Sequence, residues 1–412
     1  MKKLALLAAL AVLMLLPAAR AHTREEIRAA YRAITEPTDA SPYAAEPVVT
    51  PPYQAGDLTE AARADALAWL NYMRWLAGVG PVSESVIYDY QCQHGATLLA
   101  ALDYVDHNAP NPGNMDGDFY DSAHLATTSS SIAKLAWMRP TILRDGIAYF
   151  LRDDGESNLT VLGHRRWALN PMMSATGFGL ANSRSGASYV VMYAHDLGNR
   201  DVDWDTVCWP AAGAFPATLM HANLAWSITL NPYRYDVAGS QPVVTLAEPS
   251  LGLSFRFYPR TGGGDGSCAL NLEGYGPGPC LIFRPDFDEG FTDYQQNQRW
   301  VVRVEGLLDA GGNDAPIEYA VEMASLHAED VAAVELSALE AVLAPGETLR
   351  LEARVVPDYA DDLSVTWRST DPAVASVDGD GLVIALAPGR CEIVAASVNG
   401  REDACALTVQ AP

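Results

Sequence analysis

Positive charge is scarce in this sequence. Its 412 residues include 27 lysines and arginines against 51 aspartates and glutamates, which gives a formal net charge of −24 at pH 7. Proteins bind nucleic acids and anionic membrane surfaces through a positive face, so this balance argues against both kinds of partner. Acidity favours solubility and permits contacts with divalent cations, although it does not establish them.

Several catalytic patterns are also missing. No GxSxG nucleophile elbow surrounds the serine run Ser129–Ser131, and no glycine loop of the kind that cradles phosphates is found. None of the cysteines forms a CxxC pair for zinc or redox chemistry. The sequence therefore offers no complete arrangement of nucleophile, base and orienting residue.

The cysteine content suits an oxidising compartment, but the pairing stays open because six cysteines allow about fifteen connectivities. The pairs suggested by closeness in the sequence are Cys268 with Cys280 and Cys391 with Cys405, and these leave Cys92 to pair with Cys208. If Asn399-Gly400 forms the turn of a symmetric hairpin, Cys391 and Cys405 lie about three positions out of register. Their separation is then about 10 Å, too far for a bridge. Either the register differs or these two thiols are free and buried.

Long hydrophobic runs are confined to the first residues. Residues 1–21, MKKLALLAALAVLMLLPAARA, combine a Lys-Lys start, an apolar run and a small-x-small ending at Ala19 and Ala21. This is the pattern of a cleaved secretory signal, with His22 as the first mature residue. Later apolar runs are short and interrupted, so we expect an exported, soluble protein with no transmembrane segment in the mature chain.

The next two parts of the chain differ in pattern. Residues 22–57 begin with a short helical pattern and then become Pro-rich and loose, which is typical of a tether or wrapping arm. Residues 58–200 carry helical patterns followed by a hairpin signature, which indicates an α+β layered domain. The helical patterns cover about 59–77, 84–106 and 130–151, and the hairpin covers 177–193. Gly95, inside the second pattern, indicates the close approach of another backbone.

The sequence beyond residue 200 is β-rich. Residues 201–328 hold short runs such as VVTLAEP, CLIFRPD and RWVVRVEGL between glycine and proline clusters, with period-two alternation. This pattern favours a β-sandwich of immunoglobulin type. Residues 329–412 repeat it, with Leu349, Leu351 and Ala353 alternating with polar neighbours. We therefore predict two all-β immunoglobulin-like sandwiches after the α+β domain.

An ordered set of segments runs through residues 58–198. It comprises Leu70-Asn71-Tyr72-Met73-Arg74, Gly80-Pro81-Val82, Asp106-His107-Asn108, Gly163-His164-Arg165, Gly177-Phe178-Gly179 and the strand 189–193. This set resembles the CAP superfamily, the secreted proteins named for cysteine-rich secretory proteins, antigen 5 and pathogenesis-related-1 proteins. The resemblance implies a three-layer α+β CAP-type domain with a cleft that holds His107 and His164.

This sequence differs from the CAP superfamily pattern at the acidic positions. Many members hold two acidic residues near the histidines, the first in a GEN tripeptide, where this sequence has serine within 129–133. Asp145, Asp153, Asp154 and Glu156 are candidates for the second acid. A divalent metal such as zinc would be held by His107 and His164, but two imidazoles rarely retain an ion without a further ligand. His124, beside many hydroxyls, is a candidate third ligand.

The segment GHRRWALNP, residues 163–171, combines a titratable ring, fixed positive charge and a large apolar surface. Residues three apart share a helix face, so we expect Trp167 to lie beside His164 and shield its imidazole from water. Arg165 and Arg166 are expected to point away and form surface pairs with Asp153, Asp154 or Glu156. The full set of cleft candidates is His107, His164, His124, Trp167, Asp154 and Glu156. His195 is expected to make only a structural hydrogen bond.

The last part of the chain carries a second resemblance. Its cues are Pro345-Gly346-Glu347-Thr348, Val365–Asp371, Val374–Asp378, Gly381-Leu382-Val383 and Pro388-Gly389. This pattern resembles a bacterial immunoglobulin-like domain of group 2. The resemblance implies a spacer or adhesive module at a cell surface.

Together these patterns lead to one preferred function and two alternatives. We expect a secreted or cell-surface CAP-type protein, with no catalysis, that binds an envelope component, lipid or peptide through a two-histidine cleft. The immunoglobulin-like modules would act as spacers or adhesive domains. One alternative is a metal-dependent hydrolase, in which His107, His164 and a nearby acid hold the ion that activates water. The other is a purely structural surface adhesin.

Overall fold

The computed structural model describes residues 21–34, 40–136, 142–156, 158–288, 291, 293–327, 329–358 and 360–411. The predicted secretory signal lies outside these residues except for Ala21. The chain divides into two compact units between Ala324 and Ser325. The expected boundary near residue 200 lies inside the first unit. In the described part of the chain, no helix is long and apolar enough to cross a membrane.

The first unit contains six described α-helices, and the first four of them begin at side-chain caps. The six are α1 (Arg24–Arg32), α2 (Glu60–Leu76), α3 (Val86–Leu102), α4 (Gly117–Ser129), α5 (Ile142–Arg152) and α6 (Gly163–Ala168). The hydroxyls of Thr23, Thr59 and Ser85 each accept a first-turn backbone N–H and so fix the starts of α1, α2 and α3. The predicted helices over 59–77 and 84–106 are confirmed. Helix α3 ends early because Asp103 adopts a left-handed conformation.

The prediction of a helix over 130–151 is wrong in its first part. Residues Ser130–Leu135 form strand β4, which buries side chains on both faces and so carries no helical or alternating pattern. The segment 137–141 lies outside the described residues, and α5 follows it. Helix α4 is not predicted from its sequence, because its capping residue Asp116 stands in the acidic run DGDFYD, which looks like a turn.

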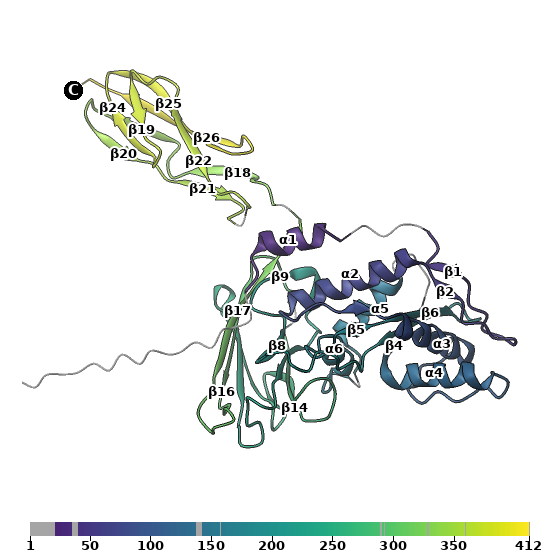
Figure 1. The fold of residues 1–412 in the computed structure, drawn as a ribbon. Helices are drawn as coiled ribbons and strands as arrows, with labels where there is room; N and C mark the ends of the chain where they lie inside the picture. Colours follow the sequence, from purple (N-terminus) through teal and green to yellow (C-terminus); the bar gives the residue numbers. More distant parts are fainter. Residues whose placement is uncertain are drawn as a thin grey trace, which may run out of the picture. The chain divides into compact units, whose positions relative to one another are not determined.

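A three-stranded sheet lies between two layers of helices (Figure 1). Its order is β4, β7 (Ser188–Tyr193), β6 (Phe178–Asn182), and both pairings are antiparallel, which confirms the predicted hairpin. Successive strand residues face opposite layers. Tyr189 and Val191 pack into the core with α3 and α4, whereas Val190 packs on α5 at Gly146, where an added Cβ would lie 2.6 Å from Val190 Cγ1. The expected α+β layering is therefore observed.

Two close backbone approaches hold α3 in this arrangement. A Cβ on Gly179 of β6 would lie 2.0 Å from the Cys92 carbonyl oxygen, so only glycine fits there. A Cβ on Gly95 would lie 2.9 Å from Ala126 Cβ on α4, which confirms the predicted close approach at Gly95. The Gln93 side chain further joins α3 to β6, because its amide oxygen and nitrogen bond the backbone N–H and C=O of Leu180.

A β-sandwich completes the first unit. One sheet has the order β14 (Gly266–Asn271), β15 (Cys280–Pro285), β10 (Trp226–Leu230), β8 (Thr206–Trp209). The other has the order β13 (Gly263–Gly264), β12 (Leu253–Tyr258), β11 (Val243–Glu248), β16 (Arg299–Glu305), β17 (Ile317–Ala324), β9 (Gly213–Pro216). The sheets meet at buried aromatic rings, with Trp226 and Trp300 centroids 6.4 Å apart. The β-rich prediction for 201–328 is confirmed.

Short elements connect these layers. They are β1 (Tyr43–Ala45), β2 (Asp57–Leu58), β3 (Ser83–Glu84), β5 (Ala175–Thr176), and the short 3-10 helices Ala217–Leu219 and Pro249–Leu251. Helix α1 is tied to the sandwich, because Arg24 Nε donates to Glu322 Oε1 at 2.6 Å and His22 forms a bridge with Gly213. The helical layers and the sandwich are thus one packed body.

The second unit is a small all-β domain. Its strands are β18 (Ala333–Leu336), β19 (Glu340–Leu343), β20 (Thr348–Arg350), β21 (Ala353–Val356), β22 (Val365–Ser369), β23 (Ala375–Val377), β24 (Leu382–Ala385), β25 (Gly389–Ser397) and β26 (Glu402–Val409). The sheets are β19-β26-β25-β22, β20-β24-β23 and β18-β21. Leu351, Ile393 and Leu407 are in the core between them. The predicted second sandwich is therefore observed.

All six cysteines are free thiols, so none of the suggested disulfides is formed. In the hairpin of β25 and β26, Cys391 lies opposite Leu407 and Cys405 opposite Ile393. The two cysteines are therefore two positions out of register, and both are buried in the same core. The alternative of free, buried thiols is the one observed. Cys280 lies opposite Asn271 rather than Cys268, and Cys92 and Cys208 belong to different layers of the first unit.

Candidate functional site

Arg165 ties helix α6 to the sandwich. The side chain is 1% exposed, and its guanidinium donates to the carbonyl oxygens of Leu151 at 2.5 Å, Arg152 at 2.7 Å and Ala225 at 2.6 Å. Leu151 and Arg152 end α5, whereas Ala225 precedes β10 of the sandwich. Burial lowers the pKa of Arg165 to about 10, so the group stays charged near neutral pH.

Arg166 makes a parallel set of bonds. Its guanidinium donates to Val161 O at 3.0 Å, Asn271 Oδ1 at 2.6 Å, Glu273 O at 3.1 Å and Gly278 O at 2.8 Å. The prediction that the two arginines form surface pairs is therefore wrong. Both are buried, because the sandwich folds over this helix, a contact that no local sequence pattern reveals. Helix α6 is held between the two parts of the unit.

Asp153 orients His164. The imidazole Nδ1 lies 2.9 Å from Asp153 Oδ1, and Asp153 Oδ2 accepts the backbone N–H of His164 at 3.0 Å. Asp153 is 1% exposed and has a positive φ of 50°, which turns the chain so that its carboxylate meets the start of α6. The acid beside this histidine is thus Asp153, not Asp154 or Glu156. The bond places the proton on Nδ1 and leaves Nε2 as an acceptor.

His107 is exposed and lies at the far end of α4. Its Nδ1 is 2.8 Å from the carbonyl oxygen of Thr127 in the last turn of that helix. Its electrostatic neighbour is His195, whose pKa is lowered by burial and further by His107. The described residues show no hydrogen bond or ring contact between His107 and His164. The imidazole that shares the surroundings of His107 is therefore His195, and a hollow shared by His107 and His164 stays a prediction.

Trp167 covers His195 rather than His164. The two ring centroids are 4.3 Å apart with an interplanar angle of 40°. The backbone N–H of His195 also bonds the Ser129 carbonyl oxygen, 3.2 Å away, so the residue is held against the start of β4. A large apolar ring thus lies against an imidazole in this region, as the sequence suggested, but the histidine is a different one.

His195 faces an open hollow of about 640 Å³. The lining includes Tyr88, His195, Asp196, Leu197, Arg200 and Asp201. Polar and aromatic groups dominate this wall, and Leu197 is its aliphatic member. The hollow therefore suits a ligand with many polar groups more than a hydrocarbon chain.

Asp196 fixes one wall of the hollow. Its Oδ2 accepts the backbone N–H and the hydroxyl of Ser174, at 2.7 and 2.8 Å, and its Oδ1 accepts the Tyr88 hydroxyl at 3.1 Å. Burial raises the pKa of Asp196, but the bonds from Ser174 outweigh it and keep that pKa below its ordinary value. Tyr88 stacks on Tyr193 with centroids 3.8 Å apart and an interplanar angle of 5°. These contacts hold Tyr88 in one position before any ligand arrives.

The remaining predicted site residues lie apart from this hollow. His124 stacks on Tyr120 within α4, and its buried Nδ1 has no hydrogen-bond partner among the described residues. Asp154 and Glu156 are in the loop after α5. Across the described ranges, no group of three or more His, Cys, Asp and Glu side chains is placed to hold a metal ion.

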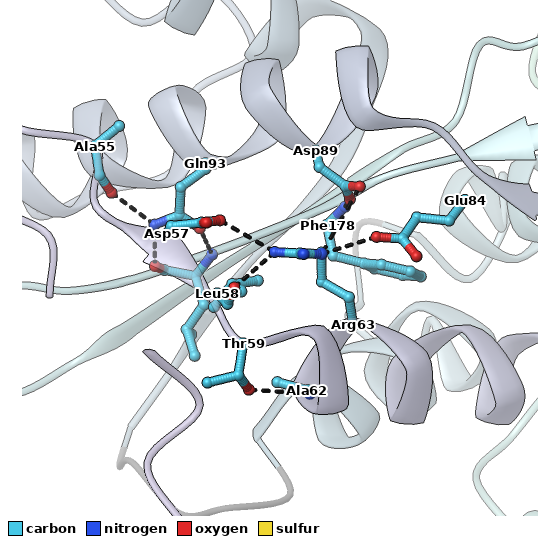
Figure 2. A network of polar contacts seen from close by, with 11 residues as sticks. Ala55, Asp57, Leu58, Thr59, Ala62, Arg63, Glu84, Asp89, Gln93 and Phe178 are labelled. Atoms are coloured by element: carbon cyan, nitrogen blue, oxygen red, sulfur yellow. Dashed lines mark hydrogen bonds and ion pairs between the residues drawn. The ribbon is translucent and has the colours of Figure 1, made fainter. Parts of the chain in front are cut away.

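A second polar network holds the start of α3, which carries Tyr88 (Figure 2). Arg63 of α2 donates to Glu84 at 2.7 Å and to Asp57 at 3.0 Å, and Asp89 Oδ2 lies 4.0 Å from its Nε. Burial raises the pKa of Asp89 to about 7, with a further rise from its bond with Glu84, although the N–H of Phe178 opposes it. Three carboxylates around one guanidinium leave an excess of negative charge, which protonation of Asp89 relieves.

The sequence analysis named Asp153 only as one of four candidate acids, and it missed Tyr88 and the position of His195 at the hollow. Asp153 was one of four acids near α6, and only its backbone turn selects it. Tyr88 is in the predicted second helix, but its position facing Asp196 depends on the packing of α3 against the strands. The one local signal was the pair His195-Asp196 at the end of a strand, since polar residues after a strand often line a site.

The second unit is similar to a known family of domains. The family profile "Bacterial Ig-like domain (group 2)" matches residues 330–408. A lacto-N-biosidase from Bifidobacterium bifidum is 42% identical over 67 residues, which are 16% of this chain and 6% of that protein. A 3-O-alpha-D-galactosyl-alpha-L-arabinofuranosidase from Bifidobacterium longum subsp. longum is 42% identical over 72 residues, 17% of this chain and 6% of that protein. The chain thus spans only a small part of these curated relatives.

This chain is only weakly similar to solved structures. An intimin mutant of EHEC O157:H7 has a TM-score of 0.16 at 16% identity and covers 18% of this chain and 45% of its own. Domains 4 and 5 of the S-layer protein SbsC have a TM-score of 0.18 at 13% identity and cover 35% of this chain and 90% of their own. The profile match, the strand order and the core of the second unit agree with one another. Residues 330–408 form a bacterial Ig-like domain of group 2.

Proposed function

We propose that this chain is a secreted or cell-surface binding protein. In this proposal the helical layers form a CAP-type domain that binds a component of the cell envelope or its surroundings without catalysis. The sandwich of the first unit supports the binding site, and the group 2 Ig-like domain acts as a spacer or adhesive module. A purely structural adhesin would need the Ig-like domain but would have no use for a preformed hollow.

Two sets of residues support the CAP-type assignment. The motif segments 70–74 and 163–165 lie on α2 and α6, and the closing strands 177–179 and 189–193 lie in the sheet. The sheet between helical layers agrees with the layering that the resemblance implies. Arg74, in the first motif, is fully buried, and its guanidinium donates to the carbonyl oxygens of Ala168 and Asn170. The first motif thus supports the segment that follows the GHR motif, which gives both motifs a shared structural role.

One observation carries the binding function. Tyr88 and His195 come from separate parts of the chain and line one polar hollow, Trp167 packs on His195, and Asp196 fixes the wall through its bonds with Tyr88 and Ser174. Rigid walls lower the entropy that a binding site must lose when a ligand is ordered in it. The Tyr88 hydroxyl in this hollow donates to Asp196, and Ser174 also donates to that carboxylate, so Asp196 serves as a structural acceptor and the arrangement supports binding.

The test is binding to a bacterial envelope fraction. Intact protein should sediment with the fraction, and the variants His195→Ala and Tyr88→Ala should each weaken binding by about tenfold or more, since each removes a ring that lines the hollow. His327→Ala, an exposed histidine of the second unit, is the matched control and should bind normally. Equal binding by all three variants would contradict the proposal.

Metal-dependent hydrolysis is a second candidate, favoured by the Asp153–His164 pair. A histidine whose Nδ1 is held by a carboxylate presents Nε2 as a ligand or a base. The metal-binding side chains of the described residues do not fit a catalytic ion with three protein ligands, however. Envelope hydrolysis that is lost in His164→Ala but retained in His195→Ala would favour this function over the binding proposal.

A further inference from the structure

We infer that the hollow at Tyr88 and His195 is a carbohydrate site that takes an uncharged glycan. This inference rests on the proposed binding function and names the chemical class of its ligand. It depends on three features of the hollow: two supported ring surfaces, polar groups beside them, and a charge balance that disfavours anions.

The first feature is a pair of supported rings. Tyr88 has Tyr193 behind it at 3.8 Å, and His195 has Trp167 behind it at 4.3 Å. Both front rings line the same hollow. Each is supported by a second ring, so it offers a flat surface with little freedom to lose on binding. A sugar ring has a face of C–H groups that packs on such a surface, with its hydroxyl groups around the edge.

The second feature is the set of polar groups at the edge of these rings. Arg200 and Asp201 line the hollow, and Arg200 Nε bonds the carbonyl oxygen of Leu197 at 3.3 Å. The guanidinium offers further donors and the carboxylate offers acceptors, so together they match hydroxyl groups, which both donate and accept. Asp196 is not the ligand-binding acid, because Ser174 and Tyr88 already occupy its oxygens.

The third feature is charge. The hollow sets one arginine against two aspartates, and the lowered pKa of His195 keeps that imidazole neutral near pH 7. The chain as a whole has a net charge of −24. Nucleotides, uronic or sulfated glycans and anionic lipid headgroups would meet net negative charge there. A hydrocarbon chain would find only Leu197 as an aliphatic partner. An uncharged glycan fits all three features.

The experiment is calorimetric titration of the intact protein with maltoheptaose, cellohexaose and chitohexaose, and with neutral oligosaccharides released from the envelope fraction. We expect binding to at least one of these glycans. Tyr88→Ala and His195→Ala should each weaken it by about tenfold, the effect of losing one aromatic contact. Tyr88→Phe keeps the ring and should weaken it only about twofold to threefold. Tyr233→Ala, which removes a tyrosine 87% exposed on the sandwich, is the control.

A spectroscopic readout places the ligand. Because Trp167 lies behind His195, glycan binding should change tryptophan fluorescence, and Trp167→Phe should abolish that change while calorimetry still detects binding. Circular dichroism of each variant separates loss of binding from loss of folding. If none of the glycans binds, or if Tyr88→Ala and His195→Ala bind them normally, the inference is wrong.

The same variants separate this inference from the proposed function. Suppose that envelope binding depends on Tyr88 and His195 but is not reduced by the oligosaccharides, and that a peptide or lipid vesicle competes instead. Then the hollow is a binding site and the carbohydrate class is wrong. If Tyr88→Ala and His195→Ala both bind the envelope fraction as the parent does, the proposed function and the inference are both wrong.

Discussion

The two sides of the hollow are held in place by different kinds of electrostatics. Trp167, behind His195, is on α6, which Arg165 and Arg166 join to uncharged backbone and amide oxygens. Tyr88 is on α3, whose first turn is next to the carboxylate network around Arg63 (Figure 2). The first support keeps its charge at any ordinary pH, whereas the second contains Asp89, whose pKa of about 7 allows it to titrate. One side is thus held by buried hydrogen bonds that do not change with pH, and the other contains a carboxylate that titrates near neutral pH.

The largest effect is expected from breaking the α6 side. Arg165→Met removes the guanidinium that donates to the carbonyl oxygens of Leu151, Arg152 and Ala225, two of these bonds being buried and one partly buried. We expect the free energy of unfolding of the first unit to fall by about 3 kcal/mol or more, the usual cost of removing one member of a buried charged network. Urea denaturation followed by tryptophan fluorescence measures it.

The control for that change is an arginine in an exposed pair. Arg303→Met removes a guanidinium whose partner is Glu318 at 2.9 Å on the open face of the sandwich. Exposed pairs contribute little, so the unfolding free energy should change by less than about 0.5 kcal/mol. Equal losses in Arg303→Met and Arg165→Met would mean that α6 is not held by its buried arginine.

A smaller, pH-dependent effect is expected on the α3 side. The folded protein raises the pKa of Asp89 from its ordinary 3.8 to about 7, so the folded state binds more protons than the unfolded state between these values. The associated stability is present below pH 4 and is lost as the pH rises through 7. Asp89→Asn keeps an acceptor and a donor but cannot ionise, so at pH 8 we expect it to be more stable than the parent by about 2 kcal/mol.

The measurement is urea denaturation of both proteins at pH 4.5, 6 and 8, since the gap should open with rising pH. Asp57→Asn, in the same network but on a largely exposed side chain, should give no such pH-dependent gap. A constant difference between Asp89→Asn and the parent at all pH values would show that Asp89 does not titrate in this range.

The smallest expected effect is a change in the pKa of His195 when its neighbour His107 is removed. The charge of protonated His107 lowers the pKa of His195, so His107→Ala should raise that pKa toward its ordinary value. Nuclear magnetic resonance titration of the histidine ring protons follows this shift directly. A shift of the His195 pKa in the opposite direction would contradict the proximity of the two rings.

Elements with strong local patterns could be predicted from the sequence. Helix α2, the hairpin of β6 and β7 and the strands of both sandwiches follow from apolar periodicity and turn residues, because local patterns determine local structure. Strand β4 could not be recognised, since its two buried faces remove the alternation that marks a half-exposed strand. Helix α4 begins at an aspartate cap within an acidic run, which looks like a loop.

The site was harder to predict because it depends on contacts between distant segments. The arginines beside His164 have the pattern of surface residues, and their burial depends on partners far along the chain, such as Ala225, which lies 60 residues after Arg165. In the same way, Trp167 contacts His195 because the segment that follows β7 packs beside α6. Residue types near the site could be read from the sequence, but their pairing depends on the packing of the layers.

The most direct test of this account is to map the envelope ligand onto the histidine rings by nuclear magnetic resonance. Adding solubilised envelope glycans to the intact protein should shift the ring signals of His195 and leave those of His164 unchanged, because His195 lines the hollow and Asp153 already holds His164. Shifts confined to His164, with His195 unaffected, would contradict the account and place the ligand at the Asp153–His164 pair.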